Sequence, residues 1–137
     1  MHANESNNDT KLNDTDLEDL VSIVIVNFNS GDQLVNCVNS ILVHSKFVIE
    51  KIIIVDNSSK DNSHINAVFE GSLITQINND QNLGFARACN QGAAECSSEF
   101  ILFLNPDTLI RNSCIKMTTE FMVNASPSVG VCGIKTT

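Results

Sequence analysis

Four short apolar runs, each followed directly by asparagine or aspartate, limit most strongly what this chain can fold into. They occupy residues 21–26, 51–55, 73–77 and 100–104. Short apolar runs that end in turn residues predict buried strands. The segments between them carry apolar residues at helical spacing, such as Leu34, Val38 and Ile41. Strands that alternate with helices predict an α/β fold, with a doubly wound, mostly parallel sheet and helices on both faces.

The fourth run has the most abrupt end. Its sequence Phe-Ile-Leu-Phe-Leu stops at Asn105-Pro106-Asp107. Unbroken apolar character predicts a strand that is buried on both faces of the sheet. Ligands of open α/β sheets bind just beyond the carboxyl ends of the strands, so Asp107 lies where a ligand or a metal is expected. The alternative is an ordinary surface turn that caps the following helix.

Amide or carboxylate side chains follow the other three strands as well: Asn27 and Asn29, Asp56 and Asn57, and Asn78 and Asp80. The carboxyl ends of parallel strands lie along one edge of a sheet, so these side chains should converge there. Turns favour asparagine and aspartate in any case, which makes each single instance weak. Their recurrence at every strand end favours a site for a polar ligand.

The rest of the chain predicts further elements and one arm. We expect helices at residues 61–69, at 84–96 and between Asn112 and Pro127, and a fifth strand at 129–134. Residues 1–19 are rich in acidic residues and asparagine and hold few aliphatic side chains. Such a segment buries too little apolar surface to order itself, so we predict a disordered arm at 1–19 and one domain over 20–137.

The composition excludes several classes of partner. The net charge is −8 and no cluster of lysine or arginine occurs, which argues against binding to nucleic acid or anionic lipid. No apolar stretch reaches the roughly 18 residues of a membrane span, and the N-terminus does not resemble a secretory signal. Five cysteines form no CxxC pair, so we expect free buried thiols and a cytoplasmic location.

The motifs of common nucleotide enzymes and hydrolases are missing. The first strand–helix turn holds one glycine, Gly31, instead of a dinucleotide fingerprint, and neither a P-loop nor a G-x-S-x-G motif occurs. A receiver-like domain using Asp56 is disfavoured because no paired acid cluster follows the first strand. A nucleoside diphosphate suits the two remaining acids: Asp56 can contact base or ribose, and Asp107 can hold Mg²⁺ or Mn²⁺ with the phosphate oxygens.

Four sequence blocks carry a family resemblance. They are VSIVIVNFNS, IIVDNSSKDNS, NNDQNLGFARACNQG and FLNPDT, in this order along the chain. Together they resemble glycosyltransferase family 2, and most of all the bacterial rhamnosyltransferase-like enzymes that build cell-surface polysaccharides. The resemblance covers residues 21 to about 135. It implies the nucleotide-sugar-binding half of the Rossmann-like GT-A fold.

The resemblance also implies roles for single residues. The implied nucleotide-sugar-binding set is Val26, Phe28, Asn29, Asp56, Asn82, Gly84, Arg87, Asn105 and Asp107. Val26 and Phe28 would line the nucleobase pocket and Arg87 would support the nucleotide site. Asn105-Pro106-Asp107 would replace the Asp-x-Asp motif of the family, with Asp107 as the metal ligand. The alternatives are a core position for Phe28 and an ion pair with Asp80 for Arg87.

The activity implied by the resemblance is transfer of a sugar, with inversion, from a nucleotide diphosphate to a saccharide or lipid-linked acceptor. A dTDP-rhamnose-like donor is one candidate, and the full-length enzyme is expected at the inner face of the membrane. Asn105 leaves a single ionic metal ligand. The acceptor-binding half and the catalytic base have no match here, so we expect a C-terminally incomplete domain with no catalytic residue that binds donor only. The alternative is a non-catalytic remnant that serves as a binding or assembly module.

Overall fold

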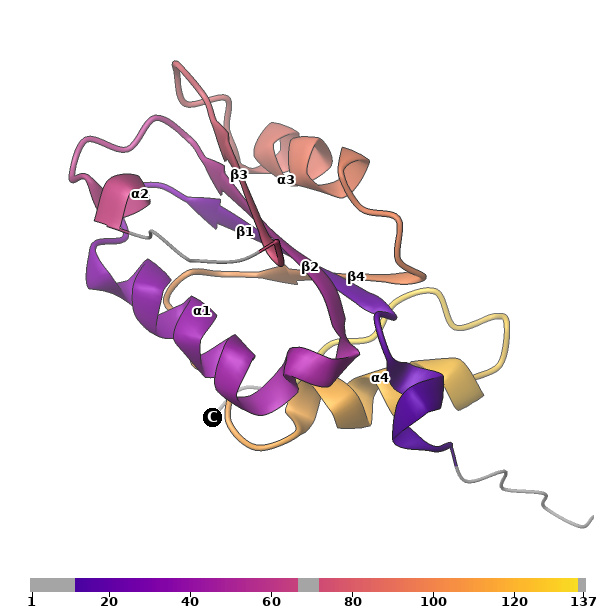
Figure 1. The fold of residues 1–137 in the computed structure, drawn as a ribbon. Coiled ribbons are helices and arrows are strands. Elements are labelled where there is room, and N and C mark those ends of the chain that lie inside the picture. The colour runs from indigo at the N-terminus through magenta and orange to yellow at the C-terminus, as the bar shows by residue number, and fades with distance from the viewer. Residues whose placement is uncertain (1–11, 67–71, 136–137) are drawn as a thin grey trace, which may run out of the picture.

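A computed structural model of the chain describes residues 12–66 and 72–135. Four parallel strands form one sheet in the order β3-β2-β1-β4. The strands are β1 (Val21–Asn27), β2 (Ile49–Asp56), β3 (Ile74–Asn78) and β4 (Phe100–Leu104), as Figure 1 shows. The predicted α/β class with a parallel sheet is therefore confirmed.

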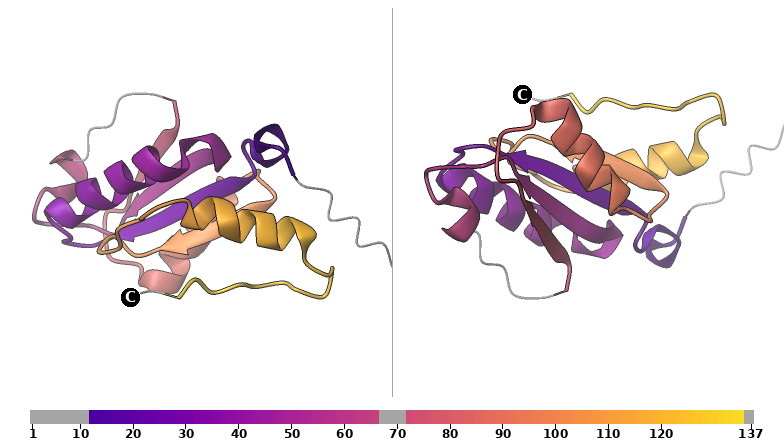
Figure 2. Two further views of the ribbon diagram at one scale, coloured as in Figure 1. Left: turned by 90° about the horizontal axis from the view of Figure 1, so that it is seen from below. Right: turned by 90° about the horizontal axis from the view of Figure 1, so that it is seen from above.

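Helices cover both faces of this sheet, as predicted (Figure 1 and Figure 2). The α-helices are α1 (Asp32–Ser45), α2 (Ser63–Asn66), α3 (Phe85–Ala94) and α4 (Cys114–Asn124), and two short 3₁₀ helices are η1 (Asp14–Leu17) and η2 (Lys46–Val48). Helices α1 and α4 lie on one face and α3 lies on the other. None of the described helices is long and apolar enough to cross a bilayer.

The core has two parts, one on each face of the sheet. Ile23 and Ile52 belong to the larger cluster, which includes the buried side chains of α1. Val24 and Val55 point to the other face, where they pack with Ala88 of α3. Burial on both faces explains why β1 and β2 read as continuous β-branched runs instead of alternating patterns.

Strand β4 departs from the prediction that it is buried on both faces. Ile101 is 39% exposed and Phe103 is 49% exposed, whereas Leu102 and Leu104 pack against the core. The reason is the position of β4 at the end of the sheet: α3 packs on β1 and β2, so the same face of β4 has no helix over it. An apolar run does not reveal whether both of its faces are covered.

The predicted fifth strand is also wrong. Residues 129–135 are irregular and exposed, and Val131 is 89% exposed. Gly130 and Gly133 lower the strand preference of this segment. The predicted helix at 61–69 is shorter than expected, because α2 ends at Asn66 and residues 67–69 lie outside the described residues.

The predicted disordered arm is corrected in its second half. Residues 14–17 form η1, and Leu17 is only 1% exposed. Lys116 of α4 forms an ion pair with Asp14, so this segment is fixed to the domain by a buried leucine and a charge contact. Residues 1–11 lie outside the described residues. The ordered domain therefore begins before residue 20.

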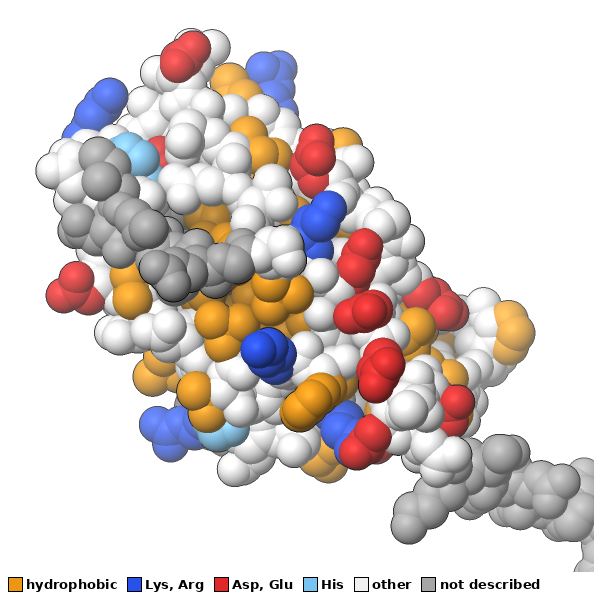
Figure 3. Space-filling view, viewed as in Figure 1, with side chains coloured by type: hydrophobic (Ala, Val, Ile, Leu, Met, Phe, Trp, Pro, Cys, Tyr) orange, Lys and Arg blue, Asp and Glu red, His pale blue; other side chains and the backbone are white. Residues whose placement is uncertain are grey.

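Charged side chains of both signs lie on the surface of the described residues. On the face drawn in Figure 3, the described Lys and Arg side chains are scattered among acidic ones and form no continuous basic patch. The five cysteines are unpaired, as predicted, but only Cys37 and Cys89 are buried.

Candidate functional site

The strand order defines a topological switch point between β1 and β4. From β1 the chain proceeds to β2 on one side, and β4 returns on the other side of β1. Crevices at such points, beyond the carboxyl ends of the strands, are the usual ligand sites of open α/β sheets. Phe28 follows β1 and Asn105 follows β4, and Ile25 pairs with Leu104 in the register of these strands. Phe28 is 49% exposed, so it is not a core residue.

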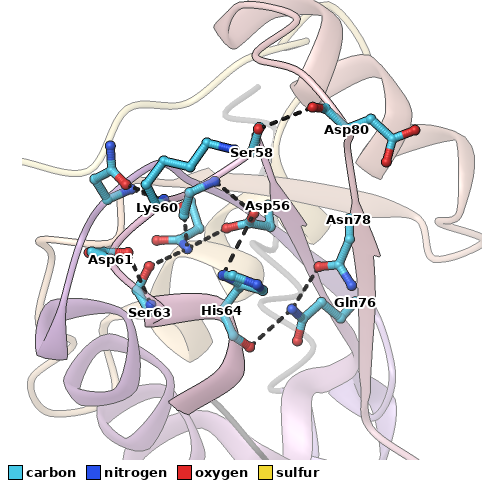
Figure 4. Close-up of polar contacts among 12 residues, drawn as sticks. Asp56, Ser58, Lys60, Asp61, Ser63, His64, Gln76, Asn78 and Asp80 are labelled. Carbon is cyan, nitrogen blue, oxygen red and sulfur yellow. Dashed lines mark hydrogen bonds and ion pairs between the residues drawn. The ribbon is translucent and has the colours of Figure 1, made fainter.

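Asp56, at the end of β2, is more buried than its turn sequence suggested. The residue is 2% exposed. Asn27 Nδ2 donates to Asp56 Oδ1 at 2.7 Å, and the backbone N–H of Ser59 donates to Oδ2 at 3.0 Å. His64 Nδ1 lies 4.0 Å from Asp56 Oδ2 (Figure 4). Each carboxylate oxygen can accept more than one hydrogen bond, so Asp56 retains acceptor capacity while its orientation is fixed.

Asn27 is the centre of this buried cluster. It is fully buried, and Nδ2 also lies 2.8 Å from Ser63 Oγ and 3.2 Å from Ser59 Oγ. Its Oδ1 is buried and accepts no hydrogen bond from any residue that the structure describes. The sequence marked Asn27 only as a strand-end residue. Its role as a donor to Asp56 was missed because the partner lies 29 positions away in the chain.

Asn29, predicted to bind nucleotide, uses its polar groups to hold two loops together. Its N–H donates to Ser59 Oγ at 3.0 Å, and its Oδ1 accepts from the N–H of Lys60 at 2.7 Å.

A second contact joins the same two loops, since the N–H of Gly31 donates to Asp61 Oδ2 at 2.8 Å. Hydrogen bonds from Ser63, and from Gly31, lower the pKa of the Asp61 carboxyl. These contacts fix the loop that presents Phe28.

Three more of the predicted nucleotide-binding residues lie in or just before the first turn of α3. Gly84 has a φ of 83° and is the N-cap of this helix; the left-handed region is costly for residues with a Cβ. Asn82 Oδ1 accepts from the N–H of Gly84 at 2.8 Å. Arg87 is exposed in the first helical turn. Within the described ranges Arg87 forms no ion pair, so the alternative contact with Asp80 is not present.

Asp107 is exposed in the loop that follows β4. This loop lies against α1, since Cys37 Sγ donates to the carbonyl oxygen of Asn105 at 3.7 Å. Burial, and after it the negative charge of Asp107, raises the pKa of the Cys37 thiol to about 12. Val26, at the end of β1, is half-buried.

No group of three or more His, Cys, Asp or Glu side chains in residues 12–66 and 72–135 could hold a metal ion by itself. A cation at Asp107 would therefore need further oxygens from a ligand or water. Mg²⁺ accepts such an arrangement, because it keeps several waters and is bound by one or two carboxylates plus substrate phosphates. The exposed Asp107 carboxylate fits this donor set.

Solved structures share this fold. The crystal structure of Staphylococcus aureus TarS 1–349 in complex with UDP-GlcNAc matches 82% of the chain with a TM-score of 0.66 and 19% identity, and the chain covers 37% of it. A second TarS structure matches 75% of the chain with a TM-score of 0.65 and 21% identity, and 19% of that chain is covered. The molecule is thus an α/β domain of the GT-A-like class.

The chain belongs to glycosyltransferase family 2, whose model matches residues 22–136. Glycosyltransferase GlyG of Streptococcus pneumoniae is 31% identical over 103 residues, which are 73% of this chain and 34% of that protein. An uncharacterized glycosyltransferase of Nostoc is 30% identical over 121 residues, 81% of this chain and 35% of that protein. The chain therefore spans about a third of the length of these relatives.

Proposed function

We propose that this chain is the donor-binding part of an inverting family 2 glycosyltransferase and binds a nucleotide-diphosphate sugar. The observation that carries the proposal is the edge at the β1–β4 switch point, where exposed Phe28 and Asp107 follow the two strands and Asp56 ends the neighbouring strand β2. The donor is a nucleotide sugar, with a dTDP-rhamnose-like compound as one candidate. The acceptor is a saccharide or a lipid-linked saccharide, and the reaction takes place at the cytoplasmic face of the membrane.

The nucleoside would lie at the ends of β1 and β2. Phe28 exposes about half of its surface, and an aromatic face of this kind suits contact with a nucleobase. Val26 supplies an apolar neighbour. Asp56 is held by Asn27 and Ser59 with acceptor capacity left over, which suits a ribose hydroxyl or the imino group of a base.

The diphosphate needs positive charge, and this acidic chain, with a net charge of −8, offers little of it. Arg87 is exposed and forms no ion pair among the described residues. Asp107 would hold Mg²⁺ or Mn²⁺, with Asn105 beside it as a neutral neighbour. When bound, the metal would neutralise the charge that develops on the departing diphosphate. Because Asn105 carries no charge, we expect metal binding to be weak without nucleotide.

The residue that takes the proton of the acceptor would lie outside this chain. A general base must reach the acceptor hydroxyl directly or through one water, and we assign no residue here to that role. One part of the full-length enzyme would then bind the donor, and another part would activate the acceptor.

Calorimetric titration with UDP, dTDP and GDP, with and without Mn²⁺, tests the proposal. UDP is the first probe because TarS has been crystallised with UDP-GlcNAc. We expect Mn²⁺-dependent binding of at least one nucleotide, and loss of that dependence in Asp107→Ala. Glu99→Ala removes an exposed carboxylate just before β4, at the amino-terminal ends of the strands and away from the proposed site. This variant should retain wild-type affinity. Absence of metal-dependent binding by all three nucleotides would contradict the proposal.

A non-catalytic binding module remains the alternative to an enzyme part. A longer protein that includes the acceptor-binding half distinguishes the two. Sugar transfer by that protein supports the glycosyltransferase. Donor binding without any transfer or donor hydrolysis supports the module.

A further inference from the structure

The side chain of Asn57 is directed into the protein, and the residue is only 2% exposed. Its Oδ1 accepts from the backbone N–H of Leu83 at 3.0 Å and from Asn79 Nδ2 at 3.3 Å. Its Nδ2 donates to Asn82 Oδ1 at 2.9 Å. All of these partners lie in the turn between β3 and α3. Asn57 therefore connects the end of β2 to the turn that precedes α3.

Two further contacts fix the same turn. Asn79 and Gln91 exchange a reciprocal pair of amide hydrogen bonds, 2.8 Å and 2.9 Å long, which joins the turn to the middle of α3. Ser58 Oγ donates to the carbonyl oxygen of Asp80 at 3.2 Å (Figure 4). The turn is thus held on one side by the residues after β2 and on the other by α3.

Packing alone does not fix this part of the chain. Residues 80–87 are exposed except for the half-buried Leu83. The first deeply buried side chain of α3 is Ala88. Since apolar contacts are few here, the position of the first turn of α3 depends on the side-chain amides, and Asn57 makes three of these bonds, as many as Asn79.

We infer that Asn57 is a positioning residue for nucleotide binding. It holds the turn at residues 79–84 beside the end of β2, where the N–H of Asn79 donates to the carbonyl oxygen of Asp56 at 2.9 Å, and so fixes the start of α3, the helix that carries Arg87. This inference rests on the proposed function. Asn57 itself does not contact the ligand, because its polar atoms are occupied within the protein.

The test measures UDP affinity in the presence of Mn²⁺ by calorimetry, at a temperature at which every variant is folded. Asn57→Ala should weaken binding about tenfold, since the hydrogen bonds that fix the turn are lost. The matched control is Ser98→Ala, which removes hydrogen bonds to Ser22 and Phe100 at the amino-terminal ends of β1 and β4. This control should lower the melting temperature while leaving the affinity for UDP unchanged.

A double-mutant cycle separates positioning from general destabilisation. Arg87→Ala should weaken UDP binding in the wild-type background and have little further effect in the Asn57→Ala background, because Arg87 is then no longer held in place. Equal effects of Arg87→Ala in both backgrounds would overturn the inference, and so would the absence of any effect of Arg87→Ala.

The outcomes also distinguish this inference from the proposed function. If the wild-type chain binds no nucleotide, the proposed function fails and the inference falls with it. If the wild type binds and Asn57→Ala has the same affinity, only the inference is overturned. Should Asn57→Ala not fold, Gln91→Met removes the partner of Asn79 and touches no proposed ligand contact. It should weaken UDP binding about threefold, and wild-type affinity of this variant would overturn the inference.

Discussion

Asn27 donates from Nδ2 to Oδ1 of Asp56 over 2.7 Å, and this bond joins the ends of two neighbouring strands. The two residues are partners in the register of β1 and β2, and they are 0% and 2% exposed. A buried carboxylate is tolerated only when its oxygens accept hydrogen bonds. Asn27 therefore allows β2 to end in an acid inside the protein.

Replacing Asn27 by leucine removes one of the hydrogen bonds that the buried Asp56 carboxylate accepts and leaves the bond from Ser59 in place. We expect Asn27→Leu to lower the free energy of unfolding by about 2 kcal/mol, the usual effect of losing a hydrogen bond to a charged group. Urea denaturation measures the change. Asn39→Ala, at an exposed position of α1, is the control and should stay within about 0.5 kcal/mol of wild type. A similar loss in both variants would contradict the role of Asn27.

Gly92 marks the closest approach of α3 to the sheet. A Cβ at this position would lie 2.4 Å from Cγ1 of Val24. Gly92→Ala should therefore destabilise the protein by about 1–3 kcal/mol through overcrowding, although alanine favours a helix more than glycine does. Adding Val24→Ala should recover part of the loss because it removes the clashing methyl groups. Strictly additive losses in the double variant would show that the contact is not the cause.

The two faces of β4 should respond differently to truncation. Leu102 packs against the core, whereas Phe103 is 49% exposed on the other face. Leu102→Ala should cost about 2 kcal/mol or more, and Phe103→Ala should cost clearly less even though it removes a larger side chain. Thermal or urea unfolding of both variants checks this. A larger loss for Phe103→Ala would mean that the exposed face of β4 is covered.

Alkaline pH should weaken the fold through Cys37. Its pKa rises from 9.0 to about 12 because of burial, and then because of Asp107. Between these values the folded state keeps the proton that the unfolded state has released, so the free energy of unfolding falls as the pH rises. Urea titrations from neutral pH to about pH 11 should show a smaller decline in Cys37→Ala. An unchanged decline in that variant would assign the effect to other groups.

The sequence predicted those parts of the fold that depend on local pattern. Strands β1 and β2 were recognisable because burial on both faces demands unbroken β-branched residues, and the helices followed from their spacing. The exposure of Phe103 was not predictable, since it depends on where α3 lies. Val131 was misassigned to a strand for a related reason: a short apolar pattern does not reveal whether a pairing partner is within reach.

Part of the geometry at the candidate site was predictable as well. Strand-end asparagines and aspartates correctly indicated an edge rich in polar groups. The sequence did not show which of these residues bond to other loops and which face outward, because the bonds of Asn57 and of Asn29 join loops that are 22 to 31 positions apart in the chain. Turn residues that hold one another and turn residues that face a ligand look alike in a sequence.

Paramagnetic broadening of amide resonances tests the central claim most directly. We would record NMR spectra of the isotopically labelled chain with UDP, adding small amounts of Mn²⁺. Donor binding at the β1–β4 switch point predicts that the amide resonances of Asn105, Asp107, Thr108 and Phe28 broaden first, and only when UDP and Mn²⁺ are both present. Broadening that is independent of UDP, or that centres on another part of the molecule, would contradict the account.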